Sequence, residues 1–264
     1  MTEELTYKKE AAAGYDRAFA HVTTQFVPFL LQAAHIAPGM HVLDIAAGTG
    51  IVSEAALGIV GPTGHVTAAD LSPAMVDKAR ERLAKAKNAS VAVENGQALS
   101  FSDESFDAVV CGFGLMFFPD PLRGLNEFRR VLRPGGRTAV SVNTVPEHSF
   151  NTRINLAIAH HVPSLARVAA RVFSLGDEEK LRSLLEAIGF RDVEIATQTH
   201  RFVFPSFDAY FEPVEHGAGS PGQAFALLPE GTRHAVREEV RRDLGDTGGP
   251  IEVEVEYMFG SGRR

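Results

Sequence analysis

The sequence predicts an α/β protein built on a doubly wound, mostly parallel sheet. Three observations support this: short β-branched runs bounded by Gly, Asp, Asn or Ser, amphipathic segments between them, and regular alternation of the two over about 100 residues. Apolar runs without polar alternation are typical of strands covered on both faces, and strand-helix alternation is typical of parallel sheets. The 264 residues suffice for one such domain or for two small ones.

Five short runs in the first half are expected to form the parallel strands, each buried on both faces. They are residues 42–45, 66–69, 91–93, 106–111 and 138–142. After residue 143 the pattern changes, and long strands are predicted over 193–204 and 251–257. In the last of these, apolar residues alternate with Glu252, Glu254 and Glu256, so one face is wet. Such a strand is expected to pair antiparallel and to lie at or near a sheet edge.

The helices predicted between these strands have recognisable ends. Ser72 is expected to cap a helix that begins at Pro73, and a second helix over 121–132 is expected to stop before Pro134. Further helices are predicted over 152–172, 178–188 and 233–244. The stretch from 205 to 229 contains Pro and Gly and carries no helix prediction.

Composition excludes several classes of function. The net charge is −7 and no Lys or Arg cluster offers a strip for a phosphate backbone, so no nucleic acid partner is expected. Cys111 is the only cysteine, which rules out an internal disulfide and suits a reducing compartment. The polar start and the lack of any run near the roughly 18 apolar residues of a membrane span predict a cytoplasmic, soluble protein.

The stretch VLDIAAGTG, residues 42–50, is the first candidate binding motif. Ligands of parallel sheets bind beyond the carboxyl ends of the strands, where this strand ends in small residues. Gly48 and Gly50 permit a sharp turn and close approach of a ligand to the main chain, and the helix from about residue 51 would point free N–H groups there. The motif predicts a nucleoside or dinucleotide site; the alternative is a tight turn that needs glycine for geometry alone.

Asp70 is the second candidate, at the end of the predicted second strand and 20 residues after Gly50. A carboxylate at this spacing can accept hydrogen bonds from both hydroxyls of a ribose. A strand-end Asp is often a helix cap, but Ser72 already fills that position. A nicotinamide dinucleotide would require G-x-G-x-x-G, and the third small residue of that pattern falls on Ser53.

Four segments, in this order, resemble the class I S-adenosylmethionine-dependent methyltransferases, in particular the small-molecule branch similar to the ubiquinone and menaquinone biosynthesis methyltransferases. They are PGMHVLDIAAGTG, AADLSPAMVDKAR, ENGQALSFSDESFDAVVCGFGLMFFPDP and EFRRVLRPGGRTAVS. The resemblance implies a single domain over 1–264, with a seven-stranded Rossmann-like sheet and an antiparallel C-terminal edge hairpin. Residues 38–143 would form the cofactor-binding core and 1–37 a helical cover. Residues 144–264 would add the last strands and substrate-covering insertions at 144–180 and 205–250.

The resemblance also implies S-adenosyl-L-methionine as cofactor and S-adenosyl-L-homocysteine as product. Asp44 would orient the glycine turn and act toward the methionine end, Asp70 would bind the ribose hydroxyls, and Leu71 and Met75 would flank the adenine. Asn95 stands where many relatives have an acid for the adenine amino group, and its amide accepts without charge assistance. The implied cofactor-binding residues are Tyr15, Asp44, Ala46, Ala47, Gly48, Thr49, Gly50, Asp70, Leu71, Met75, Asn95, Gly96, Gln97, Cys111, Gly112 and Phe113.

Methyl transfer mainly requires that a nucleophile be aligned in a dry pocket, although oxygen and carbon nucleophiles often lose a proton as well. His148, after the fifth predicted strand, is the candidate base; the alternative is a solvated loop histidine. Cys111 is expected to be a small buried hydrophobe rather than a nucleophile. No metal is expected, because the histidines show no ligand spacing and we expect the rings of His160 and His161 to lie on different helix faces.

The acceptor is expected to be a small molecule methylated on O, N or C. Two apolar clusters either belong to the core or line the pocket, and in the second case the acceptor is partly apolar or aromatic. They are Phe113, Leu115, Met116, Phe117 and Phe118, and Phe202, Phe204, Phe207, Tyr210 and Phe211. A homodimer through the edge hairpin is a further expectation. A non-catalytic protein of the same fold and a nicotinamide-dependent oxidoreductase remain the alternative functions.

Overall fold

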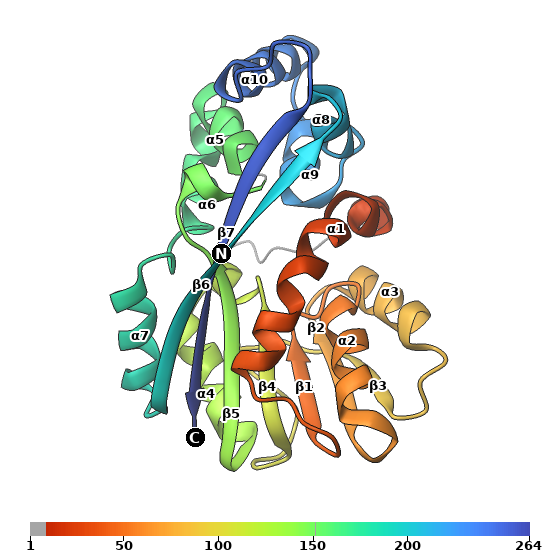
Figure 1. Cartoon of the computed structure of the whole chain (residues 1–264), viewed down its shortest axis with the longest axis vertical. Coiled ribbons are helices and arrows are strands. Elements are labelled where there is room, and N and C mark those ends of the chain that lie inside the picture. Colours follow the sequence, from red (N-terminus) through yellow and green to blue (C-terminus); the bar gives the residue numbers. More distant parts are fainter. Residues whose placement is uncertain (1–8, 151) are drawn as a thin grey trace.

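The computed structural model describes residues 9–150 and 152–264, which form a seven-stranded sheet flanked by helices (Figure 1). The strand order is β3-β2-β1-β4-β5-β7-β6. The strands are β1 (His41–Ile45), β2 (His65–Asp70), β3 (Ala89–Val93), β4 (Phe106–Gly112), β5 (Leu132–Asn143), β6 (Arg191–Phe204) and β7 (Ile251–Arg263). The first five pair in parallel, and β7 is antiparallel to both β5 and β6. The predicted α/β class is confirmed.

The helices form two layers and a cap. They are α1 (Lys9–Ala33), α2 (Ile51–Val60), α3 (Pro73–Leu83), α4 (Pro121–Val131), α5 (Thr152–His161), α6 (Ala166–Arg171), α7 (Glu178–Ala187), α8 (Phe207–Glu215), α9 (Gly219–Ala226) and α10 (Glu230–Asp243). Helices α1, α2 and α3 contact one another on one side of the sheet, whereas α4 and α7 pack on the other. Helices α5, α8, α9 and α10 gather around the far ends of β6 and β7 (Figure 1).

Alternation along the central strands builds a core on both faces of the sheet. In β1, Val42 packs with residues of α1 and α2, while its neighbour Leu43 packs with residues of α4 and α7, and both are fully buried. The prediction of strands covered on both faces therefore holds for β1, but it is wrong for β3. That strand pairs only with β2 at the sheet edge, and its Val93 is 48% exposed.

The hairpin of β6 and β7 is longer than the rest of the sheet. Pairing of β7 with β5 stops where Tyr257 meets Asn143, so residues 251–256 pair with β6 alone. Val253 and Val255 of this extension are buried and Glu254 is exposed, which confirms the predicted alternation. The strand lies next to the edge strand β6, and the hairpin extension carries the helical cap above the parallel strands (Figure 1).

Two helix predictions after residue 143 are corrected by the structure. The single helix predicted over 152–172 is divided into α5 and α6, because Pro163 starts a separate 3-10 turn between them. The stretch without a helix prediction, 205–229, forms α8 and α9. In α8 the buried residues Phe207, Tyr210, Phe211 and Val214 have the i, i+3, i+4, i+7 spacing of a helix face, a signal that the Pro and Gly content obscured. Within the described ranges, no helix combines the length and apolar character needed to cross a membrane.

Candidate functional site

A cavity opens at the carboxyl ends of the parallel strands, beneath the N-terminal helix and the cap. It encloses about 1350 Å³ of space, its open mouth included. Its wall combines the strand ends with one face of α1 and pieces of the segment after β5. Eleven of the sixteen implied cofactor-binding residues line it, namely Tyr15, Ala46, Gly48, Asp70, Leu71, Met75, Asn95, Gly96, Gln97, Gly112 and Phe113. Asp44, Ala47, Thr49, Gly50 and Cys111 do not line it.

The glycine bend after β1 is tied to the end of β2 by Asp70. The backbone N–H of Gly48 donates to Asp70 Oδ2 at 2.8 Å, and that of Ser72 donates to Asp70 Oδ1 at 2.8 Å. Each carboxylate oxygen keeps a second lone pair for a ligand hydroxyl. Gly48 has a left-handed φ of +55°, and no atom lies within 4 Å of the place a Cβ would occupy. A ligand can therefore approach the main chain of the bend directly.

Asp44 lies below the bend and does not reach the cavity. It is fully buried, and its Oδ2 accepts a hydrogen bond from Ser53 Oγ at 2.6 Å, while Oδ1 has no hydrogen-bond partner among the described residues. Burial raises the pKa of Asp44 to about 7, although the Ser53 hydrogen bond opposes the shift and the charge of Asp70 adds to it. Ser53 is the residue that does not match the nicotinamide-binding pattern, and in the structure its hydroxyl donates a hydrogen bond to the Asp44 carboxyl group.

Asp44→Asn is expected to flatten the dependence of stability on pH near neutrality. A raised folded-state pKa gives stability that is fully present below the unfolded pKa, near 4, and is lost as pH rises through about 7. Between pH 6 and 7.5, where ordinary carboxylates no longer titrate, the ligand-free protein should lose about 1 kcal/mol of unfolding free energy through Asp44. Urea denaturation at several pH values measures this loss. An equal loss in the Asn variant would show that another group carries it.

Helix α1 is fastened to the glycine bend by a polar cluster outside the cavity. Thr49 Oγ1 donates to Asp16 Oδ1 at 2.5 Å, and Arg82 of α3 forms an ion pair with Asp16. Arg82 Nε also donates to the carbonyl oxygen of Thr49 at 2.8 Å, and its Nη1 donates to Glu54 at 2.8 Å. Thr49 therefore links the glycine bend to helix α1 through Asp16. Helix α1 lines the cavity with Tyr15, Phe19, Val22 and Thr23.

Much of the cavity wall is aromatic. Of the first predicted apolar cluster, Phe113, Met116, Phe117 and Phe118 line the wall, and Leu115 is buried behind them. No member of the second cluster, Phe202 to Phe211, lines the cavity, because these rings pack together inside the cap. The wall also includes Asn143, Phe150, Asn155, Val172 and Tyr257. The rings of Phe113 and Tyr257 lie 4.3 Å apart between centroids.

Some wall residues that the sequence analysis did not name nevertheless carry a sequence signal. Phe19, Val22 and Thr23 share a helix face with the predicted Tyr15, and Asn143 stands at the carboxyl end of β5, where ligands bind. By contrast, Phe150, Asn155 and Val172 come from an insertion whose course depends on packing against the hairpin. No local pattern marks them as part of a site.

The structure places His148 and Cys111 away from the cavity wall. The side chain of His148 lies against β7, with its ring nitrogens 3.8 Å from Glu254 and 3.7 Å from Glu256. The candidate base therefore does not line the cavity. Cys111 is fully buried in β4, and burial raises the pKa of its thiol, so it stays protonated as expected for a small buried hydrophobe.

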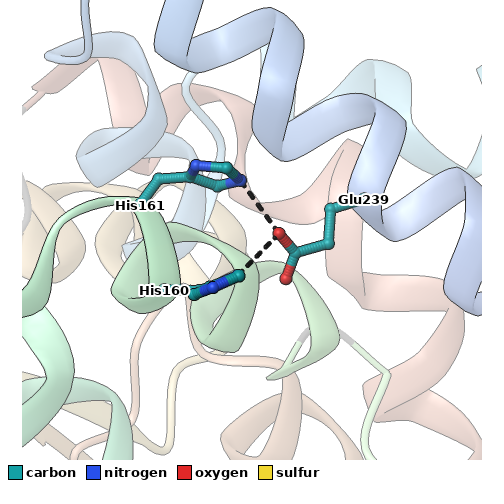
Figure 2. A group of neighbouring side chains, drawn as sticks. All are labelled: His160, His161 and Glu239. Atoms are coloured by element: carbon teal, nitrogen blue, oxygen red, sulfur yellow. Dashed lines mark hydrogen bonds and ion pairs between the residues drawn. The ribbon is translucent and has the colours of Figure 1, made fainter.

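The prediction that His160 and His161 point to different helix faces is wrong. Their ring centroids lie only 5.2 Å apart, and both rings contact Glu239 of α10 (Figure 2). His161 is the last residue of α5, where the backbone need not keep regular helical geometry. Its side chain can therefore point to the same side as that of His160, toward the packed helix α10.

Comparison with known proteins gives a consistent family. A model described as a methyltransferase domain matches residues 43–140. The ubiquinone/menaquinone biosynthesis C-methyltransferase UbiE of Legionella pneumophila is 32% identical over 179 residues, covering 62% of this chain and 72% of the relative. The demethylmenaquinone methyltransferase of Clavibacter sepedonicus is 36% identical over 186 residues, covering 64% and 75%.

Solved structures agree in fold. A phosphoethanolamine N-methyltransferase 2 of Haemonchus contortus, in complex with S-adenosyl-L-methionine, superposes with a TM-score of 0.64 at 18% identity, covering 98% of this chain and 57% of that one. A methyltransferase of Aquifex aeolicus superposes with a TM-score of 0.55 at 21% identity, covering 72% and 91%. At these identities the likeness concerns the fold alone.

Proposed function

Because the chain belongs to the class I S-adenosylmethionine-dependent methyltransferases, in the branch of the ubiquinone/menaquinone biosynthesis enzymes, we propose that it methylates an electron-rich aromatic ring. The observation that carries the proposal is the aromatic part of the cavity wall, which includes Phe113, Phe150 and Tyr257. The enzyme class and its cofactor follow from the family, and the acceptor class follows from the wall.

The residues present fit the cofactor. Asp70 has lone pairs for the ribose hydroxyls, and Gly48 leaves open space against the main chain. Asn95 Oδ1 already accepts a hydrogen bond from the backbone N–H of Gln97 at 2.9 Å, so an adenine amino group would use its second lone pair. The carboxylates of Asp70 and Glu94 give this half of the cavity the negative charge that complements a sulfonium. When bound, the cofactor supplies an activated methyl group.

The acceptor half of the wall offers contact area and neutral hydrogen-bonding groups. Burial raises the pKa of Tyr15 to about 12 and also raises the pKa of Tyr257, so both phenols stay protonated and can donate. Asn143 and Asn155 add amides. Among the described residues that line the cavity, the carboxylates belong to Asp70 and Glu94, on the cofactor side. The wall therefore suits a nucleophile that needs no strong base from the protein.

A hydroquinone-like ring has these properties. Its hydroxyls make the ring carbons nucleophilic and can accept from the Tyr257 phenol, and its faces can pack against Phe113 and Phe150. One relative is a C-methyltransferase of ubiquinone/menaquinone biosynthesis and the other a demethylmenaquinone methyltransferase, which supports the same acceptor class. We therefore place a hydroquinone, or a phenol of similar shape, first among the acceptors.

The test is a comparison of acceptors at fixed cofactor concentration. Purified protein is incubated with S-adenosylmethionine and a panel of alkylated hydroquinones, phenols, amines and small acids, and S-adenosylhomocysteine is quantified by mass spectrometry. We expect the hydroquinones to exceed the amines and acids in kcat/KM by about 100-fold, the discrimination that a few matched contacts supply. Turnover confined to amines or acids would reject the aromatic acceptor. Product binding without turnover of any compound would favour a non-catalytic protein.

A further inference from the structure

A cluster of three ligand-type side chains lies in the cap, outside the cavity. His160 and His161 end α5, and Glu239 faces them from α10 (Figure 2). The Nδ1 atom of His160 lies 3.0 Å from Glu239 Oε2, and the Nε2 atom of His161 lies 2.9 Å from the same oxygen. None of the three residues lines the cavity, so the methyl-transfer site does not use them.

We propose that His160, His161 and Glu239 bind one divalent transition-metal ion, with Zn²⁺ as the best match. Two imidazole nitrogens and a carboxylate oxygen are a ligand set that Zn²⁺ prefers, and Mg²⁺ or Ca²⁺ would require more oxygen ligands. The three ligand atoms all lie within 4.8 Å of one another. In a tetrahedral site, ligand atoms bound to zinc at about 2.0 to 2.1 Å stand roughly 3.3 to 3.4 Å apart. The spacings of 2.9 and 3.0 Å to Glu239 Oε2 are roughly 0.3 to 0.4 Å shorter, so the side chains must rotate slightly outward to admit an ion.

The arginines next to Glu239 on α10 form their ion pairs with other carboxylates. Arg237 and Arg241, its neighbours on α10, form ion pairs with other carboxylates, those of Asp208, Glu215, Glu238 and Asp246. The side chain of Glu239 is 18% exposed and that of His160 is 73% exposed. Water can therefore reach the cluster and fill the fourth position of a tetrahedral ion.

The ion would join two helices that are distant in the sequence. Helices α5 and α10 already pack together, which places the ligands before any metal binds. Helix α5 also contributes Asn155 to the acceptor end of the cavity. We therefore assign the metal a structural role, in which it fixes α5 against α10 and so holds one wall of the acceptor site.

The test uses untagged protein stripped of metal with a chelator and titrated with ZnCl₂ in a calorimeter. We expect one Zn²⁺ per chain and a rise in the melting temperature with Zn²⁺, and no comparable binding of Mg²⁺. His160→Ala and Glu239→Gln should each weaken Zn²⁺ binding by about tenfold or more, since even loss of a supporting residue has that effect. Glu239→Gln keeps the size and polarity of the side chain, so a folding defect is not expected.

The matched control is His234→Ala, which removes an exposed histidine from the same helix α10 outside the cluster. It should leave both Zn²⁺ affinity and the Zn²⁺-dependent rise in melting temperature unchanged. Circular dichroism without metal verifies that all variants are folded. Absence of stoichiometric Zn²⁺ binding to the native chain, or equal binding by the native chain, His160→Ala and Glu239→Gln, would overturn the proposal.

Discussion

Asp70→Ala is expected to weaken the binding of S-adenosylhomocysteine by about 100-fold, which corresponds to a loss of about 2.7 kcal/mol. The carboxylate supplies charge-assisted hydrogen bonds to a bound ribose, each typically contributing about 1.5 to 3 kcal/mol. It also accepts the N–H of Gly48 at 2.8 Å, so the alanine variant loses the anchor of the glycine bend as well. Isothermal titration of the product into each protein measures the loss directly.

Two further variants separate the ribose contact from a general effect. Asp70→Asn keeps one carbonyl acceptor and should give an intermediate loss of affinity, since the charge is gone but one hydrogen bond to the bend or the ribose survives. Asp77→Ala removes an exposed carboxylate of α3 that pairs with Arg80 on the solvent side, and affinity should not change. Unchanged affinity in Asp70→Ala would contradict the placement of the ribose at this carboxylate.

The parallel half of the fold was predictable because its strands are buried on both faces. Val42 and Leu43 face opposite helix layers and are both apolar. The strand can therefore be recognised in the sequence as a continuous apolar run, without alternating polar residues. The cap was less predictable. Pro163 divides a helix that the periodicity alone would continue, and the buried residues of α8 have helical spacing around Pro213, which lies inside that helix. Proline acts through local backbone geometry, so its effect depends on where tertiary contacts allow a turn.

The site divides in the same way. The cofactor half is formed by residues close in sequence to strand ends, such as Gly48 and Asp70, and strand-end position is a local signal. The aromatic part of the wall includes Phe150 and Tyr257, which lie more than 100 residues apart in the sequence and line the same cavity only because of the tertiary fold. His148 shows the limit of the same rule, because it follows β5 closely and yet turns toward the glutamates of β7.

Ala46 adopts a left-handed φ of +57°, a backbone conformation that favours glycine. Such a backbone costs an alanine about 1 kcal/mol relative to glycine. The methyl group of Ala46 is accommodated because the facing residue is Gly114: a Cβ there would lie 2.3 Å from Ala46 Cβ.

Gly114→Ala is accordingly expected to destabilise the protein by about 3 kcal/mol and to reduce cofactor affinity. The added Cβ would lie 2.3 Å from Cβ of the partly buried Ala46 and 2.9 Å from Sγ of the fully buried Cys111. Gly114 itself has φ of −101° and ψ of −41°, which suit alanine, so the whole cost arises from the collision. Because Ala46 lines the cavity, its displacement would deform the cofactor site.

The double variant Ala46→Gly/Gly114→Ala should recover about 2 kcal/mol of that loss and most of the cofactor affinity, since it restores one methyl group to the contact and gives the left-handed position a glycine. Denaturant unfolding of the wild type, both single variants and the double variant yields the coupling energy between the two sites. Gly58→Ala, on the exposed side of α2 where a Cβ meets nothing within 4 Å, is the matched control and should not destabilise. Additive effects in the cycle would show that the collision with Ala46 is not the cause.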